Sequence, residues 1–262
     1  MSDRFQKPKI YLLGYPSIDE VEMARYLTDI GAGGWDTDAP SAAEKLCEFY
    51  GRLCYRSFEA GLNKNVTKIR EGNGPYLANI NRSGHGAVVE HATLNFVFRP
   101  VSRVFTHELV RHRVGVAISQ ESMRYVRLEN MQQYASPLIE SLPDYQRDQV
   151  EGIVEETITV IEDNVKKLET LFGIDDMKNF SEKKKVTSWM RRIAPDGMLT
   201  SIGWSANFRT LRHVIPLRTS VHAEEEIREV FDIVAKICRA RFPNAFNDLS
   251  CNGQGEWTLE KS

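Results

Sequence analysis

The chain has 262 residues, of which 42% are hydrophobic, and its formal net charge is only −2. A chain of this length can bury one sizeable core, and the near balance of charge excludes the broad basic surface typical of nucleic-acid-binding proteins. No apolar run approaches membrane-spanning length, and the N-terminus lacks the apolar segment of a signal peptide. The composition therefore predicts a cytoplasmic protein without nucleic-acid or membrane partners.

The N-terminal part is predicted to form a strand followed by a helix. Residues 10–15 have the apolar character of a short strand. Residues 42–60 carry apolar side chains at helical spacing, and Pro40-Ser41 provides a suitable start. This helix would bring Ser57 to its end.

A half-buried strand and a second helix are predicted next. Over residues 92–100, apolar side chains at Leu94, Phe96 and Phe98 alternate with Asn95 and Val97, and Pro100 closes the strand. A helix then begins at Ser102 and delivers the triplet Arg111-His112-Arg113 near its C-terminal end, before Gly115.

The C-terminal half is predicted to be helical. One apolar stripe marks a long helix and consists of Val154, Ile158, Ile161, Val165, Leu168 and Phe172. Further helices are expected over residues 189–192, 199–217 and 223–242. Because no repeat or linker interrupts the chain, residues 1–262 are predicted to form a single α+β domain.

The sequence offers no recognisable metal or Rossmann motif. His107 and His112 are five residues apart, about 140° around a helix, so they cannot share one metal ion from one helix face. The glycine clusters lack the Gly-x-Gly-x-x-Gly spacing, so a dinucleotide would have to bind without that motif. No Cys-x-x-Cys pair is present, and buried thiols without metal or redox roles are predicted for Cys47, Cys54, Cys238 and Cys251.

Arginines concentrate in two places. Residues 99–127 hold six arginines against Glu108 and Glu121, and residues 191–218 hold five against Asp196. Arginine presents a planar fork of donors that matches phosphate oxygens, and short hydroxyl and amide side chains complete such a site. The stretch 111–125 combines both kinds of residue, so it predicts a pocket for a phosphorylated small molecule.

This stretch also resembles the signature of the flavin-dependent thymidylate synthases, in which an Arg-His-Arg triplet precedes Ser-x-Arg-Tyr. Here eight residues separate Arg113 from Ser122, one more than in the commonest family form. The resemblance implies methylation of dUMP to dTMP with FAD as cofactor and with NADPH and 5,10-methylenetetrahydrofolate as co-substrates. It also implies the family fold, a small mixed or antiparallel sheet with long helices, in a homotetramer with shared active sites.

The resemblance assigns roles residue by residue, and Glu108 and His213 stand where the family often has Gln and Asn. FAD contacts are implied for Ser57, His85, Arg111, His112, Arg113, Val114, Gln120, Asn207, Arg209 and His213. Substrate contacts are implied for Glu108, Arg111, Gln120, Glu121, Ser122, Met123, Arg124, Arg191 and Arg218. His85 and His91 resemble one family segment, whose first histidine lies against flavin and folate in the family.

Arg218 is the predicted catalytic residue. Adding a one-carbon unit to the uracil ring requires electron density at its fifth carbon, supplied by an attacking cysteine or by negative charge held on the ring. No cysteine lies near the arginine clusters in the sequence, and a permanently charged arginine would stabilise the ring anion. Pyrimidine hydroxymethylation and a non-catalytic nucleotide or flavin sensor are the alternative functions.

Each residue also has a purely structural interpretation. His85 could be a loop or core histidine, and Ser57 could be a helix cap. Arg191 could lie on a solvated helix face, and Arg113 could interact with a helix C-terminus. The coincidence of order and spacing in several segments favours the functional interpretation.

Overall fold

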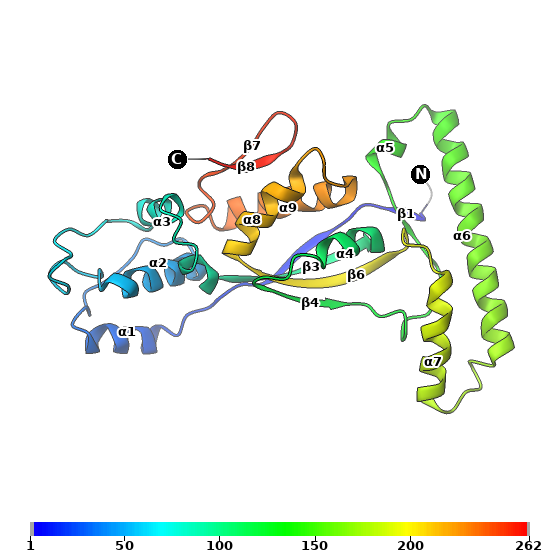
Figure 1. Cartoon of the computed structure of the whole chain (residues 1–262), viewed down its shortest axis with the longest axis horizontal. Coiled ribbons are helices and arrows are strands. Elements are labelled where there is room, and N and C mark those ends of the chain that lie inside the picture. Colours follow the sequence, from blue (N-terminus) through cyan, green and yellow to red (C-terminus); the bar gives the residue numbers. More distant parts are fainter. Residues whose placement is uncertain (1–2, 261–262) are drawn as a thin grey trace. The chain divides into compact units, whose positions relative to one another are not determined.

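A computed structural model describes residues 3–260 and divides the chain into two compact units. The first unit contains the residues up to Lys9, Val97–Arg111 and Ile118–Gly203. The second contains Ile10–Phe96, His112–Ala117 and the residues from Trp204 onward. Helices and short sheets are mixed, which confirms the α+β class (Figure 1). The single domain stays a prediction.

The largest sheet has four strands in the order β2 (Ile10–Gly14), β3 (Thr93–Ser102), β6 (Leu199–Asn207) and β4 (Val116–Gln120). The short strands β1 (Phe5–Gln6) and β5 (Gln133–Tyr134) pair in parallel. The strands β7 (Leu249–Cys251) and β8 (Trp257–Leu259) pair antiparallel. Strands β3, β4 and β6 each contribute residues to both units.

Two sequence-based predictions about these strands need correction. β3 has the predicted alternation, with Leu94, Phe96 and Phe98 buried, but it continues through Pro100 to Ser102. The single helix predicted over residues 199–217 is wrong, because this region forms β6 and then α8 (Phe208–Thr219). Buried Ile202, Trp204 and Ala206 alternate with more exposed neighbours, which is the period of a strand.

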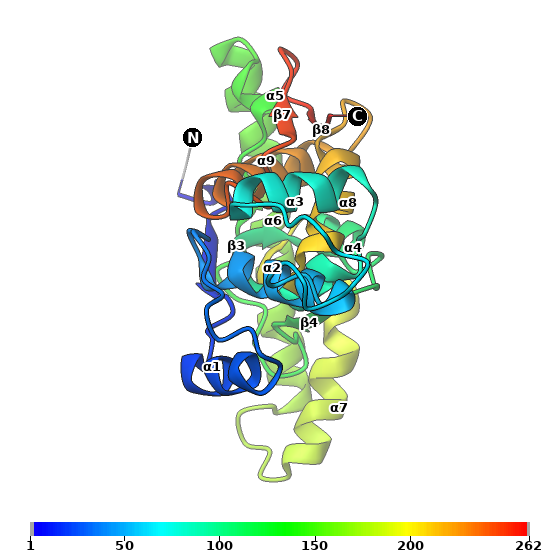
Figure 2. The ribbon, with the colours of Figure 1, turned by 90° about the vertical axis from the view of Figure 1, so that its left-hand side faces the viewer.

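In the first unit, α6 (Asp144–Phe172) and α7 (Phe180–Met190) lie side by side (Figures 1 and 2). The predicted stripe of α6 packs inward, with Ile158 and Val165 each only 2% exposed. Its partners include Leu128, Met131, Ile174 and Met190. The prediction is wrong at the end of the stripe, where Phe172 is 41% exposed because the helix ends there.

The shorter elements of this unit are α4 (Arg103–Leu109), α5 (Pro137–Glu140) and the 3-10 turn η2 (Arg191–Ile193). Ser102 caps α4 as predicted, accepting a hydrogen bond from the backbone N–H of Phe105 at 3.0 Å. The helix predicted over residues 189–192 is only the end of α7 together with η2.

In the second unit, α8 packs against α9 (Glu225–Arg241) and the 3-10 turn η1 (Val88–His91), and α2 (Ala42–Tyr55) packs against η1 and α3 (Asn73–Arg82). Helix α1 (Glu20–Asp29) packs on α2, with Met23 and Leu27 in one cluster with Phe49. Aromatic residues fill the core around α8, where the ring of Phe208 lies 5.1 Å from both Phe242 and Phe246. Each such buried ring stabilises the fold by roughly 1.5–3 kcal/mol. Figure 2 shows α3 beside α2, and the candidate pocket lies at this pair.

Helix α2 begins as predicted but ends earlier. The hydroxyl of Ser41 accepts from the backbone N–H of Glu44. The helix ends at Tyr55, because Arg56 takes a left-handed conformation with φ of 48°. Ser57 therefore lies two residues beyond the helix.

The prediction that all four cysteines are buried is right for Cys47 and Cys238 and wrong for Cys54 and Cys251. Burial raises the pKa of Cys47 to about 12, so its thiol stays protonated. Cys54 shares the helix face of Cys47 but falls in the last turn of α2, where its neighbours Leu53 and Tyr55 are also exposed.

Candidate functional site

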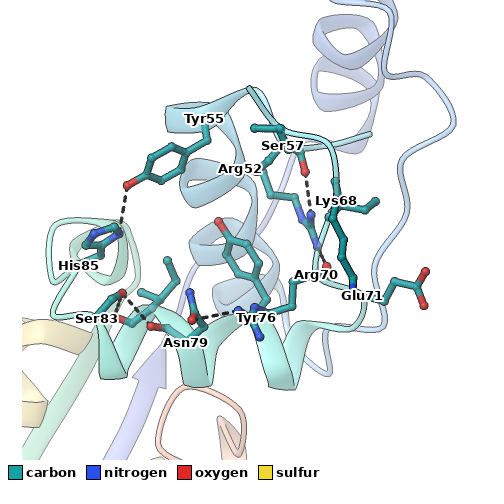
Figure 3. Close-up of a pocket in the computed structure, with 13 residues that line it drawn as sticks. Arg52, Tyr55, Ser57, Lys68, Arg70, Glu71, Tyr76, Asn79, Ser83 and His85 are labelled. Carbon is teal, nitrogen blue, oxygen red and sulfur yellow. Dashed lines mark hydrogen bonds between the residues drawn. The ribbon is translucent and has the colours of Figure 1, made fainter. Parts of the chain in front are cut away.

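A pocket of about 790 Å³ opens between the end of α2, the loop that follows it and α3 (Figure 3). Its volume lies in the range of small-molecule and cofactor sites. The predicted residues Ser57 and His85 both line it. The other lining residues are Arg52, Tyr55, Val66, Lys68, Ile69, Arg70, Glu71, Tyr76, Asn79, Ile80 and Ser83.

A buried ion pair between Arg52 and Glu48, which was not predicted from the sequence, lies at the wall of the pocket. Arg52 is 3% exposed and Glu48 is 1% exposed, and the guanidinium Nε of Arg52 donates to Glu48 at 2.8 Å. The two remaining guanidinium nitrogens donate to the backbone carbonyls of Ser57 and Arg70, each at 2.8 Å. This buried arginine therefore fixes the loop that carries Ser57.

Tyr76 forms a wall of the pocket, and its ring lies 4.6 Å from the Arg52 guanidinium. Burial raises the pKa of Tyr76 to about 12, so its hydroxyl remains a neutral donor at physiological pH. A Cβ on Gly51 would lie 2.5 Å from this hydroxyl, so the helix needs glycine there to admit the ring.

At the opposite side of the pocket, the rings of Tyr55 and His85 stack at 6.0 Å with an interplanar angle of 17°. The Tyr55 hydroxyl lies 3.4 Å from His85 Nδ1. Figure 3 shows both rings at the rim, above Ser83. His85 thus stands at a solvent-exposed edge of the pocket and is not part of the core.

The turn that follows the Arg-His-Arg triplet is fastened to the N-terminus of α8. Asn207 caps this helix by accepting from the N–H of Thr210 at 2.9 Å, and the Thr210 hydroxyl donates to the carbonyl of Val114 at 2.7 Å. Gly115 has φ of 68° and passes so close that a Cβ would lie 2.5 Å from both the Asn207 and Thr210 side chains. Val114 projects from this turn with 87% of its surface exposed.

This arrangement brings Arg218 against His112. The Nε of Arg218, in the last turn of α8, donates to Nε2 of His112 at 2.7 Å. Since Nε2 accepts this bond, the neutral ring carries its proton on Nδ1. Two residues predicted for different roles, catalysis and flavin binding, are therefore in direct contact.

Arg209 and His213 lie one turn apart on α8. Arg209 pairs with Glu90 at 2.5 Å, and its guanidinium covers Gly86, where a Cβ would lie 2.8 Å from Nε. The segment that follows His85 is thus held by the predicted Asn-x-Arg motif. His213 lines a separate hollow with Arg209, Arg212 and Pro216.

In the first unit, Glu108 and Arg111 form an ion pair of 3.6 Å on one helical turn. Gln120 donates to the Thr106 hydroxyl at 3.2 Å. Glu121 accepts from the backbone N–H and the hydroxyl of Ser201, at 3.1 and 2.9 Å. These bonds fix the direction of β4 as it leads into the Ser-x-Arg-Tyr motif.

The motif itself is a tight turn. The backbone N–H groups of Tyr125 and Val126 bond to the carbonyl of Ser122, and the carbonyl of Arg124 accepts from the Thr187 hydroxyl at 2.8 Å. Within the described residues, the buried Nε of Arg124 has no hydrogen-bond partner. An anion is the natural acceptor for such a donor. Met123 packs against the core beneath α6.

Arg191 lies in η2, close enough to Arg103 to affect the pKa of its guanidinium. Burial lowers the pKa of Arg103, and the positive charge of Arg191 lowers it further, whereas Asp196 raises it. Two like charges near one another, on the partly buried Arg103 and the exposed Arg191, favour binding of an anion.

The structure thus places the predicted residues in two groups. In the second unit it joins Ser57 with His85 and His112 with Arg218. The turn of Val114 is joined to the start of α8, because Asn207 bonds to Gly115 and Thr210 bonds to Val114. Arg113 extends from the same turn and is exposed. In the first unit it holds Glu108 with Arg111, and it positions Gln120, Glu121, Ser122, Met123, Arg124 and Arg191.

Several pocket residues escaped the sequence analysis, chiefly Arg52, Lys68, Arg70, Tyr76 and Asn79. Only Arg52 could have been predicted from a pattern in the sequence. Glu48 and Arg52 stand four residues apart on the apolar face of α2, and opposite charges at that spacing pair on a helix. For the loop residues no periodic pattern was available.

Among residues 3–260, no group of three or more histidine, cysteine, aspartate or glutamate side chains could hold a metal ion. Over the same residues, no helix is both long and apolar enough to cross a membrane.

The sequence matches the model of the family described as thymidylate synthase complementing protein over residues 37–244. The flavin-dependent thymidylate synthase of Corynebacterium glutamicum is 34% identical over 215 residues, with 82% of each chain covered. The enzyme of the same name from Mycobacterium marinum is 35% identical over 196 residues, with 75% of each chain covered.

A crystal structure of Thymidylate Synthase X from Helicobacter pylori with FAD and dUMP has a similar fold, with a TM-score of 0.55 at 18% identity. The match covers 92% of this chain and 98% of that one. The similarity confirms the predicted fold. Since the family model and the curated relatives each cover most of the sequence, the chain belongs to the flavin-dependent thymidylate synthases, the family described as thymidylate synthase complementing proteins.

Proposed function

We propose that the protein converts dUMP to dTMP in the cytoplasm by reductive methylation, with FAD as cofactor and with 5,10-methylenetetrahydrofolate and NADPH as co-substrates. The family supports this reaction, and the Helicobacter pylori neighbour was solved with FAD and dUMP. The observation in this chain that carries the proposal is the contact between Arg218 and His112.

Arg218 would act on the pyrimidine ring. Its charge is permanent, and the bond from Nε to His112 fixes the plane of the guanidinium. Negative charge develops on the ring during the reaction. The cation would therefore stabilise the transition state more strongly than the neutral ground state. The arginine would thereby raise electron density at the fifth carbon without a nucleophilic cysteine.

The residues present fit FAD. The exposed Val114 offers an apolar surface, the triplet offers arginine donors for a diphosphate, and Ser57 and His85 line a pocket with aromatic walls. Asn207, Arg209 and His213 would complete the cofactor contacts from α8. When bound, the reduced flavin supplies the hydride that turns a methylene group into a methyl group.

The first unit would hold the phosphate of dUMP. The unpartnered Nε of Arg124 and the hydroxyl of Ser122 belong to one tight turn, and Arg191 adds a further cation. Glu108, Gln120, Glu121 and Met123 would shape the remaining surface around the nucleotide. A phosphate contact is made in the ground state and the transition state alike, so these residues would control affinity more than turnover.

We further propose a homotetramer in which neighbouring subunits share sites, with Arg191 acting on the nucleotide of another subunit. The test mixes an inactive Arg191→Ala chain with an inactive Ser122→Ala/Arg124→Ala chain. Restored activity in the mixed oligomer would support a site built in trans. A mixed oligomer that stays inactive would show that each subunit carries a complete site.

Product analysis on the purified protein tests the proposed reaction. Turnover of NADPH that requires both dUMP and the folate, with dTMP as product, is the expected result. A hydroxymethylated nucleotide would favour the alternative enzyme, and nucleotide binding without any NADPH consumption would favour a sensor.

A further inference from the structure

The last turn of α8 carries Arg218 and is short. Pro216 lies inside the helix and has no N–H to donate to the carbonyl four residues earlier. Only residues 217–219 follow it before the helix ends, and Ser220 then leaves the helix with ψ of 145°. The carbonyls of a last turn also lack helical partners. Contacts from outside the helix are therefore needed to fix this turn.

The strands β7 and β8 form a hairpin that packs on α8 (Figure 1). The hairpin lies beyond residue 244, where the match to the family model ends. Arg212 of α8 holds Asp248, just before the hairpin, through two bonds of 2.7 Å. Trp257 is 6% exposed, and its indole N–H donates to Asp232 of α9 at 2.8 Å. The hairpin is thus fastened to both helices.

Two hydrogen bonds join this hairpin to the end of α8. The backbone N–H of Trp257 donates to the hydroxyl of the buried Thr219 at 3.0 Å, and this hydroxyl donates to the carbonyl of Ile215 at 2.8 Å. The Glu256 carboxylate accepts from the backbone N–H of Val221 at 2.9 Å. The hairpin therefore holds the chain directly after the arginine that is proposed for catalysis.

Glu256 is itself fixed by the turn of the hairpin. Its second carboxylate oxygen accepts from the side-chain amide of Asn252 at 2.9 Å. The Asn252 side-chain oxygen accepts from the backbone N–H groups of Gln254 and Glu256, each at 2.9 Å. The bonds from the Val221 N–H and from Asn252 lower the pKa of the Glu256 carboxyl, so it is ionised at neutral pH. The bond to Val221 is accordingly charge-assisted.

We infer that the hairpin, through Glu256 and Trp257, positions Arg218 for the proposed reaction. The last turn of α8 sets the direction from which the Arg218 guanidinium approaches His112, where Nε and Nε2 are 2.7 Å apart. A small displacement of a group that acts in the transition state lowers turnover more than substrate affinity. The inference rests on the proposed function, because it concerns the orientation of that reaction's arginine.

The hairpin also covers the core, and this second role can be separated from the first. Leu249 and Trp257 are buried and supply the apolar cover. The side chain of Glu256 instead reaches the chain between α8 and α9, and it is only partly buried. Replacing Glu256 therefore removes the bond to this chain segment and leaves the apolar cover in place.

The test compares Glu256→Ala and Thr219→Val with wild type. Gln254→Ala is the matched control, because Gln254 bonds to Asn252 and Arg228 through its backbone, which the substitution keeps. Thr219→Ser is the conservative variant, because it keeps the hydroxyl. Glu256→Ala and Thr219→Val should each lower kcat about 10-fold, equivalent to ~1.4 kcal/mol. Their FAD content should be unchanged and their KM for dUMP within about 2-fold of wild type, while Gln254→Ala and Thr219→Ser keep the wild-type kcat.

Hydrogen exchange of the unliganded protein provides a readout that does not need turnover. In Glu256→Ala, residues 217–222 should exchange faster than in wild type, while the start of α8 exchanges at the wild-type rate. Wild-type kcat in Glu256→Ala, wild-type exchange at residues 217–222, or a joint loss of kcat, FAD and dUMP binding would each overturn the inference. If the wild-type protein forms no dTMP, the proposed function fails, whereas the exchange comparison still decides whether the hairpin orders the turn of Arg218.

Discussion

Replacing Gly115 with alanine should damage both the stability and the activity of this protein. The glycine sits at φ of 68°, and its missing Cβ leaves room for the side chains of Asn207 and Thr210, each of which would otherwise be only 2.5 Å away. These two side chains cap α8 and hold the turn that presents His112 to Arg218.

The cost has three parts. An alanine in the left-handed region is unfavourable by roughly 1–2 kcal/mol, loss of the Asn207 cap costs about 1 kcal/mol, and loss of the Thr210 bond to Val114 costs about 1 kcal/mol. A total of about 3–4 kcal/mol should lower the melting temperature by about 6–16 °C for a chain of this size. Turnover should also fall, since the contact between Arg218 and His112 depends on this turn.

Gly173→Ala is the matched control. Gly173 ends α6 with φ of 60°, and nothing lies within 4 Å of its would-be Cβ. This variant should lose only the conformational part, about 1–2 kcal/mol, and should keep wild-type turnover. Calorimetry and steady-state kinetics on both variants decide the matter. If Gly115→Ala melts no lower than Gly173→Ala and turns over normally, the proposed clamp does not hold the site.

Three further outcomes are expected. Arg218→Lys should bind dUMP normally but lower kcat, because the lysine keeps the charge and loses the fork that reaches His112; normal kcat with weak dUMP binding would show that this arginine only positions the ligand. Glu48→Ala should destabilise the fold by about 3–5 kcal/mol, because it leaves Arg52 buried without its partner; chemical denaturation measures this loss, and a wild-type midpoint would contradict it. Alkylation of the native protein followed by mass spectrometry should label only the exposed thiols, Cys54 and Cys251. Labelling of Cys47 or Cys238 would disprove their burial.

Elements with a strong period were predictable from the sequence. The stripe of α6 and the alternation of β3 both pack as expected, because one face of each is buried. The error at residues 199–217 has a physical reason. Apolar residues alternate along β6 and recur at helical spacing in α8, and Asn207 sets the boundary between the two elements. Its cap was not recognised, because the residue was interpreted only as a flavin contact.

Candidate site residues in a compact motif were predictable from the sequence, whereas those brought together only by folding were not. Arg111 to Tyr125 could be identified because arginines and hydroxyl groups form a compact motif in the sequence. Lys68 and Arg70 could not, because they belong to an irregular loop whose course is fixed by the distant side chain of Arg52. The contact between His112 and Arg218 joins residues 106 positions apart, and only the folded chain reveals it.

A single-turnover experiment without oxygen tests the central claim most directly. The purified protein is loaded with FAD, reduced, separated from NADPH, and then mixed with dUMP and methylenetetrahydrofolate. Reductive methylation predicts that dTMP forms in an amount equal to the flavin that returns to its oxidised, yellow state. A hydroxymethylated product with the flavin still reduced, or no product with both ligands bound, would contradict the account.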